Sequence, residues 1–141
     1  MKPYQAFETD LNHLLNGACA VRITVSGYMP LSVEEIGSSG DGHRQVSLCH
    51  YGEQNGDLMR DPDMVFLFHS LADGPAAEPV SYRNDYLAIF HEVYRYDEAG
   101  RRSHVFPRLK QDLKEFARAW FATLREQGFF APTAVREVLS P

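Results

Sequence analysis

The chain has 141 residues, of which 44% are hydrophobic and 23% charged, a composition typical of a single globular domain with its own core. Its formal net charge of -5 argues against a nucleic-acid partner, because no overall positive field attracts a phosphate backbone. The sequence contains neither the roughly 20 consecutive apolar residues that cross a bilayer nor the apolar core of a secretion signal. We therefore expect one cytoplasmic domain, residues 1–141, with no membrane association.

The chain is expected to begin with a helix and then to change to strands. Apolar residues recur every three or four positions over residues 4–15, which predicts an amphipathic helix that ends at Gly17. Apolar and polar residues then alternate over residues 19–26, which predicts a half-buried strand. After a turn at residues 27–28, residues 29–34 are expected to form the second strand.

Three more strands are predicted in the middle of the chain. Residues 44–51 alternate in polarity, and residues 64–69 are apolar on both faces, which is typical of a central strand. Residues 71–84 contain two prolines among small residues and are expected to form a loop. Residues 86–96 are expected to form the fifth strand. The two cysteines, Cys19 and Cys49, fall in strand-like runs and are interpreted as small buried thiols in a reducing compartment.

The last large element is an amphipathic helix between Pro107 and Gly128, residues that suit the first turn of a helix and the position just past its end. Such a helix beside a half-apolar sheet normally covers that sheet, so we interpret its apolar stripe as core rather than as a partner-binding face. Residues 129–139 are expected to add a short turn of helix. The stripe consists of Leu109, Leu113, Phe116, Ala117, Trp120, Phe121 and Leu124.

Consecutive strands with short connections usually pair as neighbours, which predicts an α+β fold of two layers. Its sheet is a five-stranded antiparallel meander, with the long C-terminal helix across one face and the N-terminal helix beside it. Alternate turns of a meander lie at the same end, so Tyr28, residues 50–63 and Tyr94 are expected to converge.

The fifth predicted strand carries an aromatic face formed by Tyr86, Phe90, Tyr94 and Tyr96. Two arrangements would cover it. The chain forms a homodimer through this face, or the N-terminal helix crosses the sheet and buries it.

Residues 50–63 concentrate carboxylates, amides and a histidine between two apolar strands. Turn chemistry explains part of this stretch, because Asn55-Gly56 is a strong two-residue hairpin signal and Asp61-Pro62 favours a turn. Crowded like charges cost free energy, however, unless a cation or donor compensates them. The stretch is therefore either structural or a recognition surface. The residues expected to bind a partner are Tyr28, His50, Tyr51, Glu53, Gln54, Asn55, Asp57, Asp61 and Tyr94.

No catalytic residue, metal ligand or cofactor is assigned from the sequence. The stretch lacks the glycine and glutamate spacing of a calcium-binding EF-hand, and the chain has neither a nucleophile elbow nor a zinc-protease helix. A non-enzymatic protein that binds a protein partner through the acidic end is the favoured function. The alternative is a small metal-dependent hydrolase or nuclease-like enzyme that uses residues 50–63.

The string Glu53-Gln54-Asn55-Gly56-Asp57, with Asn84-Asp85-Tyr86-Leu87 and Glu92-Val93-Tyr94 after it, resembles a bacterial family known only as a domain of unknown function. The likeness covers about residues 18–130. The chain is also similar to proteins encoded by genes on plasmids, phages and integrative elements. The resemblance implies no established activity. It implies an accessory protein of mobile DNA, with a counter-defence or regulatory role through binding.

Overall fold

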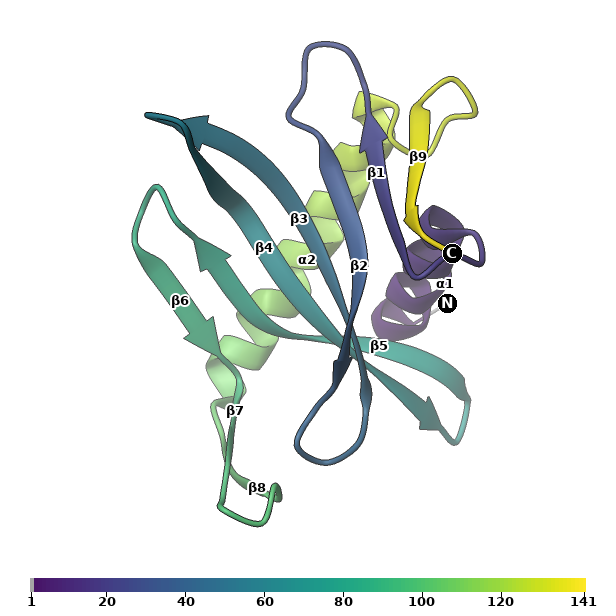
Figure 1. Ribbon diagram of the computed structural model, residues 1–141. Coiled ribbons are helices and arrows are strands. Elements are labelled where there is room, and N and C mark those ends of the chain that lie inside the picture. Colours follow the sequence, from purple (N-terminus) through teal and green to yellow (C-terminus); the bar gives the residue numbers. More distant parts are fainter. Residues whose placement is uncertain (1) are drawn as a thin grey trace.

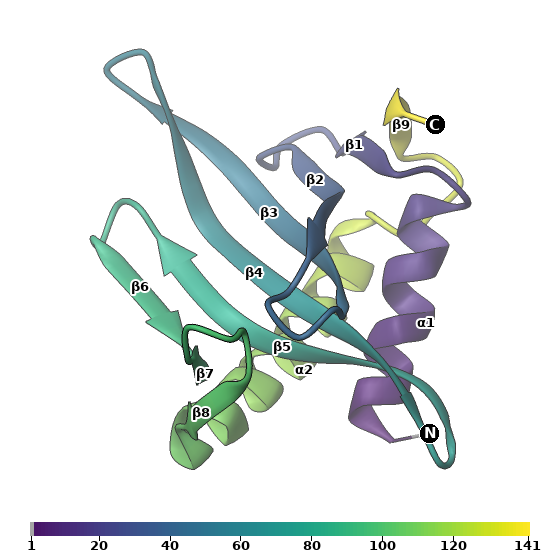
Figure 2. The same ribbon diagram turned by 60° about the horizontal axis from the view of Figure 1, so that its bottom comes forward.

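The computed structural model describes residues 2–141 as a large antiparallel sheet with two helices on one face (Figure 1). The elements in chain order are α1 (Pro3–Leu15), β1 (Ala20–Thr24), β2 (Leu31–Ser38), β3 (Arg44–Gln54), β4 (Asp57–Leu71), β5 (Gly74–Asn84), β6 (Ile89–Glu92), β7 (Tyr94–Tyr96), β8 (Arg102–Val105), α2 (Pro107–Gln127) and β9 (Val135–Ser140). Seven strands pair in the order β6-β5-β4-β3-β2-β1-β9, and β7 pairs with β8. Both helices pack on the same face of the sheet (Figure 2).

The two predicted helices are confirmed. The second is capped at Gly128 as predicted, and the first is capped at Asn16, one residue before the predicted Gly17. Asn16 takes the left-handed conformation that closes α1, and Gly128 does the same for α2 with φ at 96°. The stripe of α2 is core, since Trp120 is only 7% exposed and Leu124 is fully buried. Phe116 lies at the edge of the stripe, where its ring packs against Tyr82.

The core lies between the helices and the inner face of the sheet. Phe7 of α1 lies at its centre. The centroid of the Phe7 ring is 5.4 Å from that of Phe121 in α2 and 5.9 Å from that of Phe66 in β4. Val21 and Val33 of the neighbouring strands are fully buried beside them. The predicted two-layer α+β architecture and the consecutive strand order are therefore confirmed.

The predicted strand count of five is wrong, and the error begins at β5. Its prolines were expected to prevent a strand, but Pro75 lies beside the β4–β5 turn, and Pro79 lies at an irregularity of the ladder opposite Phe66. A missing backbone N–H is tolerated at both places. The predicted strand over residues 86–96 is instead a turn, then β6 beside β5, then β7, which leaves the sheet to pair with β8.

The C-terminal segment forms a strand, β9, where a turn of helix was predicted. It pairs antiparallel with β1, whose outer edge would otherwise have unpaired backbone groups. The Arg136 side chain of β9 also donates hydrogen bonds to the carbonyl oxygens of Leu14 and Leu15, which lie at the end of α1. The strand conformation of this segment is therefore stabilised by backbone pairing with β1 and by the hydrogen bonds from Arg136 to α1.

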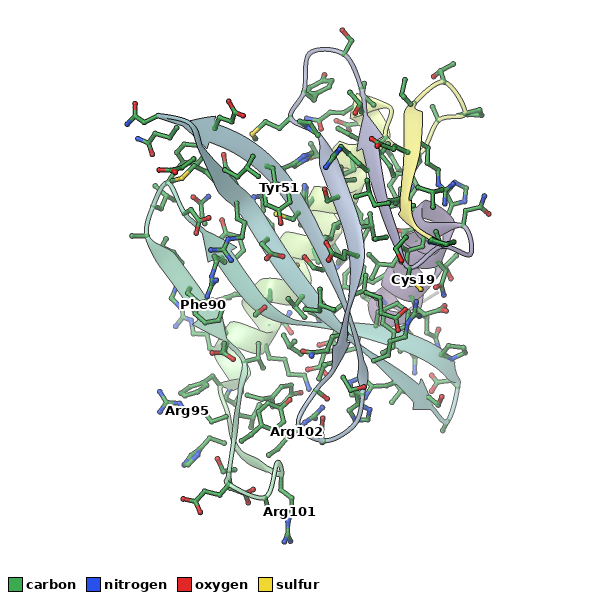
Figure 3. The ribbon with its side chains drawn as sticks, viewed as in Figure 1. Cys19, Tyr51, Phe90, Arg95, Arg101 and Arg102 are labelled. Atoms are coloured by element: carbon green, nitrogen blue, oxygen red, sulfur yellow. The ribbon has the colours of Figure 1, made fainter. Side chains whose placement is uncertain are left out.

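The two cysteines differ in their surroundings. Cys49 is 1% exposed, and burial, with Asp63 nearby, raises the pKa of its thiol to about 12. The prediction that Cys19 is buried is wrong, because it precedes β1 and is exposed at the surface (Figure 3). Within residues 2–141, neither helix combines the length and the apolar character that crossing a bilayer requires.

Candidate functional site

The tip of the β3–β4 hairpin is a two-residue turn, as the Asn55-Gly56 pair predicts. Both residues have positive φ, 54° and 84°, and Gln54 pairs directly with Asp57. Asn55 therefore has a structural role in closing the hairpin. The side chains on either side of the turn project from the end of two long strands.

The prediction that Asp61-Pro62 forms a turn is wrong, because this dipeptide lies inside β4 and has a cis peptide bond. Cys49 pairs with Asp63 and Tyr51 with Arg60, so β4 has two residues where β3 has one. Such a bulge redirects side chains. Here Asp61 accepts a hydrogen bond from the amide of Asn84, on the next hairpin, at 2.7 Å.

Arg60, Asp61, Asn84 and Asp85 join the β3–β4 hairpin to the β5–β6 hairpin, and we call this set the clasp. The Arg60 backbone N–H and Nε donate to Asp85 Oδ2 at 2.8 and 2.9 Å, and its Nη2 donates to Oδ1 at 3.3 Å. The Asp85 N–H donates back to the Arg60 carbonyl at 2.9 Å. The Arg60 guanidinium holds the pKa of Asp85 below its usual value. The clasp fixes the two hairpins relative to each other.

Gly52, in β3, leaves space for side chains from the β1–β2 and β5–β6 turns. A Cβ atom at Gly52 would lie 2.5 Å from Tyr86 Oη and 3.1 Å from Met29 Sδ, so these two side chains occupy the space that any other residue would need. Tyr86 Oη also donates to the Glu53 carbonyl at 3.2 Å. The β1–β2 and β3–β4 turns therefore lie at one end of the sheet, as predicted from alternate turns, and the β5–β6 turn, which was not predicted, lies at the same end (Figure 1).

Exposed apolar and acidic side chains gather around these turns, and we call them the hairpin-end surface. Leu58 is 67% exposed and Leu87 64%, values high enough for direct contact with a partner. Glu53 and Asp57 are also exposed, and within residues 2–141 their carboxylates have no hydrogen bond or ion pair. The members of the surface are Tyr28, Met29, Glu53, Asp57, Leu58, Tyr86 and Leu87.

Other predicted binding residues lie elsewhere. His50 is 8% exposed, its Nδ1 lies 3.0 Å from the Met29 carbonyl, and its ring packs against Trp120. It therefore fixes the β1–β2 turn from inside, and burial lowers the pKa of its imidazole. Tyr51 is half-buried on the open face of the sheet (Figure 3), and burial raises the pKa of its phenol to about 12.

The prediction that Tyr94 converges with Tyr28 is wrong. Tyr94 belongs to β7, which lies at the opposite end of β6 from the β5–β6 turn (Figure 1). Its side chain is 6% exposed, and its hydroxyl donates a hydrogen bond to the buried Glu78 carboxylate. The unpredicted strand β5 reverses the chain once more, and Tyr86 reaches the hairpin end in place of Tyr94.

The sequence also missed a polar cleft of about 250 Å³ on the open face of the sheet. Ser47 Oγ donates to Asp63 there at 2.6 Å, and burial raises the pKa of the Asp63 carboxyl. Arg83 lies 3.9 Å above the centroid of the Phe90 ring, which is exposed at the edge of the sheet (Figure 3). The alternation of polar and apolar residues over residues 80–84 is the sequence signal that could have predicted a strand here, and with it the cleft. The cleft is lined by Gln45, Asp63, Val65, Val80, Ser81, Arg83, Phe90, Glu92, Tyr94 and Tyr96.

A family model described as "Domain of unknown function (DUF6908)" matches residues 2–130. The chain belongs to this family. Neither a curated protein nor a solved structure matches the chain. The DUF6908 match includes the clasp, the hairpin-end surface and the open-face cleft, and it ends before β9.

The four carboxylates of residues 50–63 in this DUF6908 domain have three kinds of surroundings. Asp61 is bonded to Asn84, Asp63 is bonded to Ser47, and the other two lie exposed near the hairpin tip. No group of three histidine, cysteine, aspartate or glutamate side chains within residues 2–141 is arranged to hold a metal ion. The acidic stretch thus divides into two structural carboxylates and two exposed ones.

Proposed function

We propose that this DUF6908 protein is a non-enzymatic accessory protein that binds a basic protein partner through the hairpin-end surface. The observation that carries the proposal is the exposure of two carboxylates, Glu53 and Asp57, at the tip of the β3–β4 hairpin, both unpaired within residues 2–141. The exposed Leu58 lies directly across the hairpin from Glu53. Carboxylates with no internal partner can pair with lysine or arginine side chains of another protein.

The composition of the surface supports this proposal. Apolar and aromatic side chains at the centre of an interface supply most of its affinity, and charges beside them select the partner and speed association. The clasp holds two of the contributing turns in place, which lowers the entropy lost on binding. A rigid apolar patch with two free carboxylates fits a basic surface better than an acidic or a nucleic-acid one.

The cellular setting that we propose is the cytoplasm of a host that carries a mobile genetic element, with counter-defence or regulation as the purpose of binding. The support is the resemblance of the Glu53–Asp57 string and of residues 84–87 to genes of plasmids and phages. Sequencing of the DNA that flanks family genes is the direct check. Integrase, relaxase or phage structural genes beside them are expected, and consistently chromosomal housekeeping neighbours would contradict the setting.

Site-specific photocrosslinking tests where a partner binds. A benzophenone side chain at position 58 or 87 is expected to capture one defined protein in cells that express the chain. The matched control places the same group at Val135, which is equally exposed but lies on β9 at the far edge of the sheet. Equal capture from positions 58 and 135 would overturn the proposed surface.

The captured partner, once purified, allows a direct measurement of affinity. Glu53→Gln combined with Asp57→Asn is expected to weaken binding about tenfold and to reduce its salt dependence, because two screened attractions are lost. Glu98→Gln with Asp112→Asn is the control, since these carboxylates are exposed elsewhere. Unchanged affinity in the first variant would show that the carboxylates do not contact the partner.

Self-association stays a prediction. The two helices cover the same face, so α1 does not cross to the aromatic residues, and Phe90 remains 51% exposed. Tyr94, however, is buried and Tyr96 is half-buried within the chain, which leaves a smaller patch than the sequence predicts. Light scattering at micromolar concentration distinguishes a dimer from a monomer.

A further inference from the structure

A groove of about 560 Å³ lies where the two helices begin, far from the hairpin end. Its volume falls within the usual range for small-molecule sites, which is roughly 300–1,000 Å³. The first turns of α1 and α2, the β4–β5 turn and the end of β8 form its walls. The lining residues are Lys2, Pro3, Tyr4, Gln5, Leu71, Asp73, Val105, Pro107, Lys110, Gln111 and Lys114.

The groove contains every lysine of the chain. Of the 14 basic residues, 11 are arginines, and the three lysines, Lys2, Lys110 and Lys114, all line this groove. The lining has one acidic residue, Asp73, so its formal charge is three minus one, or +2, in a protein whose net charge is -5. The groove is thus a local positive region in an acidic molecule, which favours an anionic ligand.

The three ammonium groups are not equally available. Lys2 pairs with Asp73 at 2.6 Å, and Lys110 donates to Tyr94 Oη at 3.0 Å, with its Nζ 3.5 Å from the buried Glu78 carboxylate. Lys114 is half-buried and has no hydrogen bond or ion pair within residues 2–141. One positive charge therefore remains uncompensated at the wall of the groove.

The rest of the lining is largely apolar. Leu71 is 48% exposed and Val105 is 46% exposed, so both present aliphatic surface to a ligand. The ring of Tyr4 and two prolines add to this surface. Neither helix has a side-chain cap or an acidic residue in its first turn, so the positive ends of both helices add to the field of the lysines.

We propose that this groove binds a small amphipathic monocarboxylate, with its carboxylate on Lys114 and its alkyl or aryl body along Tyr4, Leu71 and Val105. A polyanion would leave the apolar wall uncovered, and a cation would meet the surplus of positive charge. Lysine supplies a mobile point charge that reaches a carboxylate without fixed bidentate geometry. Leu71 and Asp57 lie at opposite ends of β4, so this site is separate from the hairpin-end surface.

Decanoate is the test ligand, kept below its micelle-forming concentration. Reductive methylation with ¹³C-formaldehyde labels the lysines and the N-terminal amine while keeping their charge, so every labelled lysine reports on the groove. Saturable shifts are expected, largest for the Lys114 methyl signals. The neutral 1-decanol and the cationic decyltrimethylammonium are expected to bind at least tenfold more weakly. Absence of saturable shifts with decanoate, or equal binding of the cation, would overturn the proposal.

Two variants locate the ligand. Lys114→Gln is expected to weaken decanoate at least tenfold by calorimetry, whereas Arg118→Gln, one turn further along α2 and fully outside the lining, is expected to leave it unchanged. Gln111→Trp fills the groove and is expected to abolish binding. Circular dichroism confirms that each variant is folded. If Lys114→Gln and Gln111→Trp both bind like wild type, decanoate binds elsewhere and the assignment is wrong.

Discussion

The two ends of β4 use their charges in opposite ways. At the Asp57 end, Arg60 is committed to the clasp, and two carboxylates remain exposed. At the Leu71 end, Asp73 is committed to Lys2, and the Lys114 ammonium remains unpaired within residues 2–141. The guanidinium therefore serves architecture at one end through fixed bidentate bonds, and the flexible amine remains available at the other. The comparison shows that a single strand separates an acidic surface from a basic groove.

The helix α2 packs beneath both ends of the sheet, so loss of its core contacts should destabilise the hairpin-end surface and the groove together. Trp120→Ala is expected to cost about 3–5 kcal/mol, because the indole is 7% exposed and packs against His50, which holds the β1–β2 turn. Urea denaturation measures the loss. Phe116→Ala is the control and should cost less, since Phe116 is 38% exposed. A Trp120 variant that melts like wild type but no longer binds a partner would make α2 an interface rather than core.

The clasp is the next largest contribution. Asp85→Asn is expected to cost about 1–2 kcal/mol at pH 7, less than a buried charged hydrogen bond, because solvent screens Arg60. The pKa of Asp85 is lowered in the folded state, so its contribution is present above its unfolded pKa of about 3.9 and is lost as pH falls further. The difference between wild type and variant should therefore shrink as pH falls below about 4 and disappear only below the lowered pKa of Asp85 in the folded protein. A difference that persists in acid would mean that packing, not charge, holds the hairpins.

Most of the architecture was predictable because it depends on local periodicity. The stripe of α2 and the alternation of β1 to β3 are visible in the sequence and correspond to buried faces in the structure. The errors arose where tertiary pairing decided the outcome. Pro79 reads as a strand breaker, but its missing donor falls at a ladder irregularity, and β9 is a strand because β1 has a free edge.

The candidate site was predictable only in part, for the same reason. Asn55-Gly56 fixed the hairpin tip from local chemistry, and alternate turns correctly placed Tyr28 at the same end. The roles of Asp61 and Asp85 could not be predicted, because their partners lie more than 20 residues away in the sequence, on another hairpin. A high density of carboxylates in the sequence does not show which of them form hydrogen bonds within the protein and which remain exposed.

Asp63 is the carboxylate of the stretch at which partial burial works against folding. Its pKa is raised, so its ionisation lowers stability above the folded pKa, and this cost is absent below about pH 3.9. Asp63→Asn keeps an acceptor for Ser47 and is expected to stabilise the protein by up to about 1 kcal/mol at pH 7, with the gain vanishing in acid. Thermal melts at pH 7 and pH 4 measure this. A less stable variant at pH 7 would mean that Arg60 and Arg83 more than offset the burial cost.

The smallest effect on folding is expected at the two exposed carboxylates, and that smallness is what separates recognition from structure. Glu53 and Asp57 have no bonded partner within residues 2–141, so Glu53→Gln with Asp57→Asn should shift the free energy of unfolding by less than about 0.5 kcal/mol. Chemical denaturation of the variant gives this value. A loss comparable to that of Asp85→Asn would assign these carboxylates to the hairpin itself, and the acidic end would be architecture throughout. An unchanged stability with weaker binding would leave recognition by a basic partner as their role, because no bond within the hairpin then depends on either charge.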